Sequence, residues 1–168
     1  IRDGKELSKS IQLNSAYQPS LDTIVKDEKY GDISDKYFVY INSNTNFTKR
    51  AQVNLSKIFS SYQKTIKYDK ILQEKESIYT NERNIRIAKI KQINNTNKEI
   101  QIKSLKDFDT QNQSVLRQEQ EDKMKEILKD IEKTTVDFGN KNQYKAIYND
   151  KMPKCNEKDI SNEIIALL

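Results

Sequence analysis

Basic side chains and isoleucines alternate along residues 83–106, which makes this stretch the part of the chain best suited to binding chemistry. It holds seven cations and one anion, Glu99, for a net charge of +6. The cations are Arg83, Arg86, Lys89, Lys91, Lys98, Lys103 and Lys106. The isoleucines between them are Ile85, Ile87, Ile90, Ile93, Ile100 and Ile102. This pattern favours contact with acidic partners that also expose apolar groups.

On helices these isoleucines cover more than one side, so they cannot all pack into one narrow seam. We therefore expect some of them to be exposed and to form an interaction surface. The alternative is a solvated charged face over an ordinary core between two helices. Residues 107–133 carry five positive and eight negative charges, a net charge of −3, so the basic charge is concentrated at residues 83–106.

Side chains that commonly carry out catalysis or bind metals are scarce. The chain has no histidine, one cysteine (Cys155) and no glycine-rich phosphate loop. Histidine is the commonest general base and metal ligand, and cysteine is a frequent nucleophile. The sequence therefore predicts a protein without an active site, a metal or a cofactor. We expect Cys155 to be half-buried, with a cross-link between subunits as the alternative.

The composition limits how compact the chain can be. Its hydrophobic fraction is 35% and its charged fraction 33%, against about 45–50% and about 25% in ordinary globular domains. Part of the chain must then be extended and solvated. Disorder is the alternative, but a net charge of only +5 and isoleucines at helical spacing favour helices.

The elements that must position the basic stretch are predicted to be two long helices. No glycine or proline lies between Gly31 and Gly139, and these residues are the strongest breakers of helices. We expect helix over 50–133, with an N-cap at Asn46 or Thr48. The sequence "NNTN" at 94–97 predicts the turn of an antiparallel hairpin, with a single uninterrupted helix as the alternative. Isoleucines seven residues apart predict the seam between the helices: Ile71, Ile78 and Ile85, with Leu72 and Tyr79 beside them. After the turn the predicted seam resumes with Ile102, Leu105, Phe108, Val115, Leu116, Met124, Ile127, Leu128 and Ile131.

Strands are predicted on both sides of the helical region. Residues 36–44 contain five consecutive aromatic or β-branched residues, which is typical of a strand buried on both faces. Alternating apolar residues around "GNKN" predict a hairpin of two strands over 134–149. A final helix follows, capped by Asn156 or Asp159. Residues 1–35 are expected to be an irregular N-terminal extension, with a helical turn in "SLDTIVKD". The predicted fold class is α+β, mostly α.

Three segments, in this order, resemble the Skp/OmpH family of periplasmic chaperones over about residues 36–168. The opening strand of that family is similar to "YFVYINSNTNF", its closing strand pair to "TTVDFGNKNQYKAIYND", and its final helix to "KDISNEIIALL". The resemblance implies a homotrimer with a body formed by 36–49 and 134–168 and a helical arm formed by 50–133. The body residues expected to meet between subunits are Val39, Ile41, Val136, Phe138, Ile164 and Leu168. Three strands also make too small a sheet to stand alone, although an ordinary core within one chain is the alternative.

The resemblance further implies an ATP-independent holdase that binds unfolded outer-membrane β-barrel proteins between its arms and prevents their aggregation. The isoleucines of 83–106 would bind the client, and the basic residues there could also contact anionic lipid or lipopolysaccharide. The expected location is the periplasm, since the sequence begins at Ile1 and a signal peptide would have been removed. The alternatives are a basic coiled-coil scaffold or nucleic-acid-binding protein, and a purely structural helical surface protein.

Overall fold

The computed structural model of the chain describes residues 23–42, 46–94 and 96–168. These residues belong to two compact units. The first, which we call the hairpin unit, is Lys67–Lys123, and the second, which we call the sheet unit, joins the described residues from 23 to 66 with Met124–Leu168. The chain is mixed α and β and mostly helical, as the sequence predicted.

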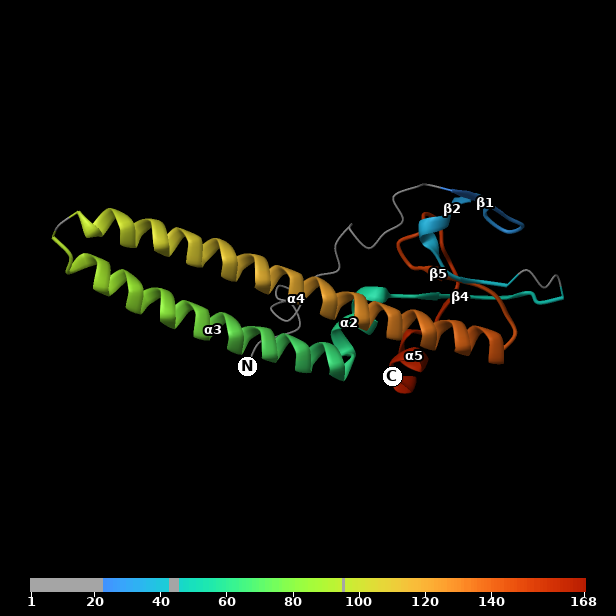
Figure 1. Cartoon of the computed structure of the whole chain (residues 1–168). Helices are drawn as coiled ribbons and strands as arrows, with labels where there is room; N and C mark the ends of the chain where they lie inside the picture. The colour runs from blue at the N-terminus through green and yellow to red at the C-terminus, as the bar shows by residue number, and fades with distance from the viewer. Residues whose placement is uncertain (1–22, 43–45, 95) are drawn as a thin grey trace. The chain divides into compact units, whose positions relative to one another are not determined.

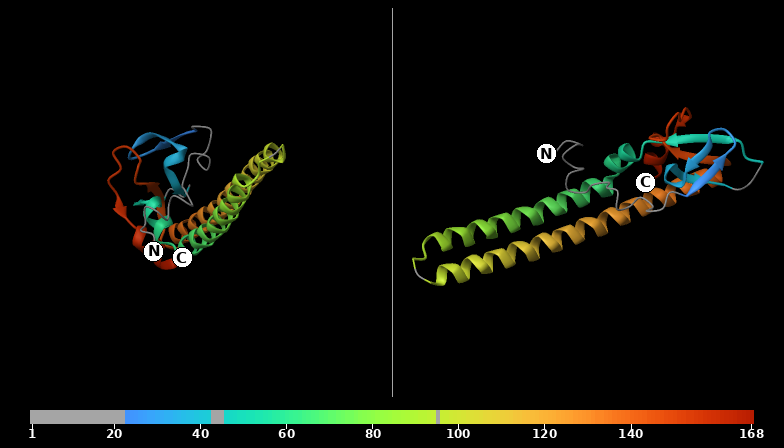
Figure 2. Two further views of the ribbon diagram at one scale, coloured as in Figure 1. Left: turned by 90° about the vertical axis from the view of Figure 1, so that its left-hand side faces the viewer. Right: turned by 90° about the horizontal axis from the view of Figure 1, so that it is seen from above.

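Four helices account for most of the described residues (Figure 1). They are α2 (Leu55–Ser61), α3 (Gln63–Lys91), α4 (Asn97–Lys141) and α5 (Ser161–Leu167). In both views of Figure 2, α3 and α4 run side by side and are joined at the asparagine-rich segment. The prediction of two helices with a turn near 94–97 is therefore confirmed, and the single uninterrupted helix is excluded.

The sheet unit contains a four-stranded sheet in the order β3-β5-β4-β6. Its strands are β3 (Phe38–Ile41), β4 (Lys49–Val53), β5 (Tyr144–Asn149) and β6 (Lys158–Asp159). Strand β3 is antiparallel to β5, whereas β4 is parallel to both β5 and β6. Adjacent parallel strands need a long crossover between them, and the helices α2, α3 and α4 form the crossover from β4 to β5.

The predicted start of the helical region was wrong. Residues 49–53 form β4, in which Ala51 and Val53 are fully buried, and helix begins only at Leu55. The N-cap is Asn54, whose side chain accepts a hydrogen bond from the Lys57 amide at 3.0 Å. A strand forms here because β4 lies between β5 and β6 and hydrogen-bonds to both, which the local sequence does not reveal.

The predicted strand hairpin over 134–149 was also wrong in its first half. Helix α4 continues to Lys141, and only β5 forms a strand, paired with β3 and β4. Buried residues four apart continue along α4 through Ile131, Thr135 and Gly139. A Cβ at Gly139 would lie 2.7 Å from the Tyr40 ring, so this glycine allows close packing of a helix on β3 rather than making a turn.

Residues 23–35 form a strand hairpin instead of the predicted irregular extension with a helical turn. Strands β1 (Ile24–Asp27) and β2 (Gly31–Ser34) pair in antiparallel register, and Gly31 at their turn has a φ of +75° that favours glycine. The rest of the predicted extension, residues 1–22, lies outside the described residues.

The sheet is covered on both faces, as Figure 1 shows for the sheet unit. On one side, Ile33 of β2 packs with Ala146, Tyr148 and Met152 in one hydrophobic cluster. Successive side chains of a strand point to opposite faces, so Ile147 points to the other side, where helices lie. Ile147 is fully buried. The core of the sheet unit therefore has two layers, one on each face of β5.

The body residues named from the sequence have different environments within one chain. Ile164 of α5 is fully buried, whereas Ile41 is 52% exposed at the edge strand β3. The predicted burial of this strand on both faces is met only in part: Tyr40 is buried against Gly139 and Phe38 is half-buried against Tyr148, but Ile41 is exposed. The remaining four are half-buried: Val39, Val136, Phe138 and Leu168. The final helix was predicted, but its predicted cap at Asn156 or Asp159 was wrong: α5 begins at Ser161, its N-cap is Ile160 without a side-chain cap, and Asp159 belongs to β6. The Asp159 carboxylate still accepts a hydrogen bond from the Ser161 amide at 2.8 Å.

Candidate interaction surface

The seam between α3 and α4 in the hairpin unit uses Leu72 and Tyr79 rather than the isoleucines predicted beside them. Leu72 is buried, and the Tyr79 ring stacks on Phe108 of α4 with 5.5 Å between ring centroids. Ile78 is 70% exposed and Ile85 51% exposed, so the prediction was wrong for these isoleucines and is confirmed for Leu72, Tyr79 and Phe108 beside or opposite them. One residue is a rotation of about 100° on a helix, and it turns these isoleucines away from α4.

Charged groups surround the stacked rings. The Tyr79 hydroxyl donates a hydrogen bond to the Asp109 carboxylate at 2.8 Å, and Arg83 Nε lies 3.1 Å and 3.2 Å from the two oxygens of the same carboxylate. The guanidinium of Arg86 lies 4.0 Å from the centre of the Phe108 ring. Two of the seven predicted basic residues, Arg83 and Arg86, thus contact α4 rather than solvent alone.

A second charged cluster lies further along the same seam. Glu119 of α4 forms ion pairs with Lys75 of α3 and, at 3.1 Å, with Lys123. The Lys75 hydrogen bond is the largest of the effects that lower the pKa of Glu119, and Lys123 adds to it. Lys123 also lies over the Tyr68 ring, 4.8 Å from its centre. The hairpin unit is therefore joined by charged and aromatic contacts more than by aliphatic ones.

Three of the six predicted isoleucines are exposed. Ile100 is 64% exposed, Ile85 51% and Ile102 39%, whereas Ile87, Ile90 and Ile93 are half-buried. The sequence prediction did not include the exposed Ile78 and Val115, because both were assigned to the seam. Their exposure could be found only by knowing which side of each helix meets the other.

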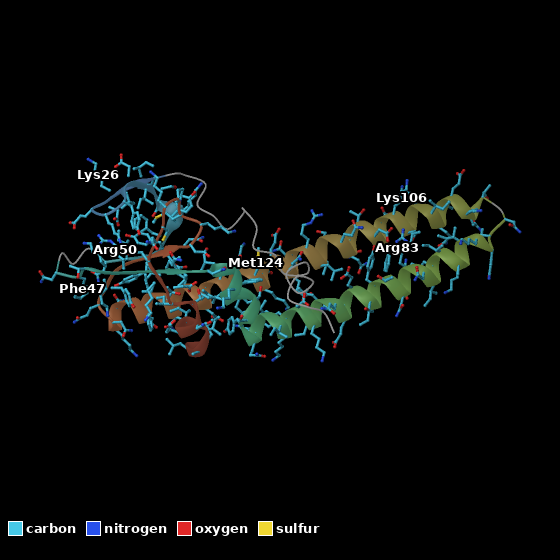
Figure 3. All side chains as sticks on the ribbon, turned by 180° about the vertical axis from the view of Figure 1, so that it is seen from behind. Lys26, Phe47, Arg50, Arg83, Lys106 and Met124 are labelled. Atoms are coloured by element: carbon cyan, nitrogen blue, oxygen red, sulfur yellow. The ribbon has the colours of Figure 1, made fainter. Side chains whose placement is uncertain are left out.

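The five lysines of the predicted basic surface are all exposed. They are Lys89, Lys91, Lys98, Lys103 and Lys106. Within the described residues none of them forms an ion pair, in contrast to Arg83 and Arg86. Figure 3 labels Lys106 and Arg83 on the two helices. We call these lysines, together with Ile85, Ile100 and Ile102, the basic–apolar surface. It combines positive charge that forms no ion pair within the described residues with large apolar groups that are open to solvent.

The sheet unit holds a buried polar cluster that the sequence prediction missed. The Tyr148 hydroxyl donates to the Asp27 carboxylate at 2.5 Å and accepts from Arg50 Nε at 3.1 Å. Burial and the hydrogen bond to Asp27 raise the pKa of Tyr148. Burial acts to raise the pKa of Asp27, but it is outweighed by hydrogen bonds from Tyr148, Tyr30 and Lys29 and by the charge of Arg50, so this pKa is lowered. These contacts join β1, β4 and β5, whose residues are too far apart in sequence to form a recognisable motif.

Cys155, the one cysteine of the sequence, is half-buried as expected. The Cys155 thiol lies 3.0 Å from the amide oxygen of Gln52, and burial raises its pKa, which lowers the fraction of reactive thiolate. Within the described residues, no three histidine, cysteine, aspartate or glutamate side chains are placed to hold a metal. None of the helices in this part of the chain is long and apolar enough to cross a membrane. Comparison with protein-family models and with curated protein sequences finds no match.

Proposed function

We propose that the chain is an ATP-independent holdase that binds unfolded proteins through the basic–apolar surface and prevents their aggregation. The observation that carries this proposal is the exposure of large isoleucines beside lysines that have no ion pair within the described chain, for example Ile100 beside Lys103, three residues further along α4. Exposed apolar groups of this size mark interaction sites.

Binding would combine two weak attractions. The lysines draw an acidic client to the surface, and the isoleucines hold its apolar segments away from other unfolded chains. Several copies acting together would multiply these contacts, because avidity grows with the number of sites engaged at once. The homotrimer that the family resemblance implies would provide these several copies of the surface. Release requires no nucleotide and occurs when the client folds or is passed on.

The proposed client class is the unfolded outer-membrane β-barrel protein, and the proposed location is the periplasm. Both rest on the resemblance described from the sequence. The positive charge of the lysines also favours contact with anionic lipid or lipopolysaccharide. The principal competitor is a nucleic-acid-binding coiled coil. The five lysines alternate with isoleucines rather than with the aromatic side chains on which bases stack, which favours a protein client.

The test is a light-scattering mass after gel filtration, with and without a β-barrel protein diluted from urea. The proposal expects a complex that keeps the client soluble. The triple variant Ile85→Ser, Ile100→Ser, Ile102→Ser should lose this protection. A matched control is Ile78→Ser with Val115→Ser, which removes exposed apolar groups outside the basic–apolar surface. If the client aggregates equally fast with and without the chain, the proposal is wrong. Retention on DNA that falls steeply with salt would favour the nucleic-acid alternative.

A further inference from the structure

The hairpin unit contains very little buried apolar surface. Among its described residues, Leu72 is the one large hydrophobic side chain that is buried. Near the turn, Ile90, Ile93 and Leu105 are half-buried around a cavity of about 60 Å³ that also touches Arg86. Aliphatic packing therefore does not by itself account for the association of α3 with α4.

Two carboxylates of α4 make the principal polar contacts across the seam. Asp109 binds both Arg83 and the Tyr79 hydroxyl, and Glu119 binds Lys75 on the opposite helix. The arginine and lysine side chains are 40% and 48% exposed, whereas the two carboxylates are only 21% and 19% exposed. Ion pairs reached by water in this way are weakened by dissolved salt, while buried apolar contacts are not.

The aromatic contacts lie among the charged side chains around Asp109. Tyr79 and Phe108 stack on each other, and Arg86 covers the Phe108 ring. Arg83 and Asp109 border these rings, because Asp109 also accepts the hydrogen bond from Tyr79. Separation of the helices would therefore break the charged and aromatic contacts together and expose both rings.

The sheet unit provides an internal comparison along the same helix. From Met124 onward, α4 buries Met124, Ile127 and Ile131 to within 1% exposure. Salt screens exposed charge pairs but does not weaken buried apolar contacts. Of the two parts of α4, only the one in the hairpin unit should thus be loosened by salt.

From these contacts we infer a conformational device. The groups around Asp109 and Glu119 form an ionic clasp that holds α3 to α4 in the hairpin unit, and rising ionic strength opens it. Opening exposes the rings of Tyr79 and Phe108 and the aliphatic groups near the turn. The inference concerns the closure of the hairpin and is independent of the proposed chaperone function.

Hydrogen–deuterium exchange of the full chain at low salt and at about 1 M NaCl, where the screening length falls to about 3 Å, tests the clasp. Backbone amides of 76–90 and 105–119 should exchange several-fold faster at high salt. Amides of 124–131 should be unchanged or slower, because the fully buried Met124, Ile127 and Ile131 hold this segment in addition to the ion pairs of Lys64 with Glu126 and Asp130. Exchange in the hairpin unit that is unchanged or slowed by salt would overturn the inference.

Charge-removing variants make the test specific. The double variant Asp109→Asn, Glu119→Gln keeps the size of both side chains but removes their charge, and it should exchange fast already at low salt with little further effect of salt. The matched control is Asp107→Asn, an exposed carboxylate on the same helix, which should retain the salt response of the unaltered chain. A full salt response in the double variant would also overturn the inference.

Discussion

The hydroxyl of Tyr148 on β5 lies 2.5 Å from the Asp27 carboxylate on β1, although 121 residues separate the two along the chain. Tyr148 is fully buried, and its ring makes an edge contact with Tyr30 at 5.4 Å between centroids. Asp27 also accepts hydrogen bonds from the amides of Lys29 and Tyr30. One carboxylate thus shapes the turn after β1 and attaches the β1–β2 hairpin to the central strand of the sheet.

Replacing Tyr148 with phenylalanine should weaken the attachment of this hairpin without disturbing the apolar packing. Asp27 and Arg50 would each lose one hydrogen bond, and a hydrogen bond to a charged group contributes about 1.5–3 kcal/mol. Urea unfolding should show that loss, and hydrogen exchange should rise at residues 23–35. Tyr144→Phe, on the same strand but half-buried, is the control and should unfold like the unaltered chain. Equal effects of the two substitutions would contradict the role of the Tyr148 hydroxyl.

Acid should weaken the attachment of the β1–β2 hairpin to β5. The pKa of Asp27 in the folded chain lies below its ordinary value of 3.8, because hydrogen bonds and Arg50 outweigh the effect of burial. A lowered carboxylate pKa stabilises the fold above the ordinary value, and this stability is lost as the pH falls through the lowered pKa. Urea midpoints measured from neutral pH down to about pH 3 should decline. The decline should be shallower in Asp27→Asn, whereas Asp32→Asn, an exposed change on β2, should keep the full slope.

Alanine at Gly139 should destabilise the chain, although the same change stabilises most helices. Within a helix, glycine is about 0.5–1 kcal/mol worse than alanine. Here the new Cβ would lie 2.7 Å from the Tyr40 ring, and such overpacking typically costs about 1–3 kcal/mol. Thermal unfolding should therefore show a lower midpoint for Gly139→Ala. The double variant with Tyr40→Ala tests the cause, since removing the ring should make the added methyl favourable; a stabilised single variant would disprove the close contact.

Substitutions at two positions of α3, six residues apart, should separate the seam from the outer face. Leu72→Ala removes a buried side chain, and truncation of a buried leucine costs about 2–5 kcal/mol. Ile78→Ala removes one that is 70% exposed, and such surface changes usually alter stability by less than about 0.5 kcal/mol. Circular dichroism during heating should show this contrast. If Ile78→Ala lowered the stability more than Leu72→Ala, the seam would lie along Ile71, Ile78 and Ile85, as the heptad spacing predicted.

Much of the helical architecture could be predicted from the sequence. The absence of glycine and proline between Gly31 and Gly139 predicts long helices, and the asparagines at 94–97 predict the turn between them. The aromatic and β-branched run at β3 predicts a strand. The basic and isoleucine-rich character of 83–106 is likewise a property of the sequence, and it defines the chemistry of the basic–apolar surface.

Local patterns failed where contacts between distant segments decide the structure. Val136 and Phe138 alternate as in a strand, yet α4 continues through them because Ile131, Thr135 and Gly139 extend its buried row. Residues 49–53 have the composition of a helix start, but they form β4 because β5 and β6 hydrogen-bond to both of its edges. In each case, the free energy of burial and strand pairing outweighs the weak local preference.

The sequence by itself determined that the helices are long, that lysines and isoleucines are clustered at 83–106, and that no histidine is present. Only the tertiary structure decided which of them face one another. It placed Leu72 and Tyr79 in the seam and left Ile78 and Ile85 exposed, and it brought Asp27, Arg50 and Tyr148 together in one buried cluster. The physical reason is that the rotation of a helix and the pairing of strands depend on partners distant in the chain, which a local spacing of residues does not encode.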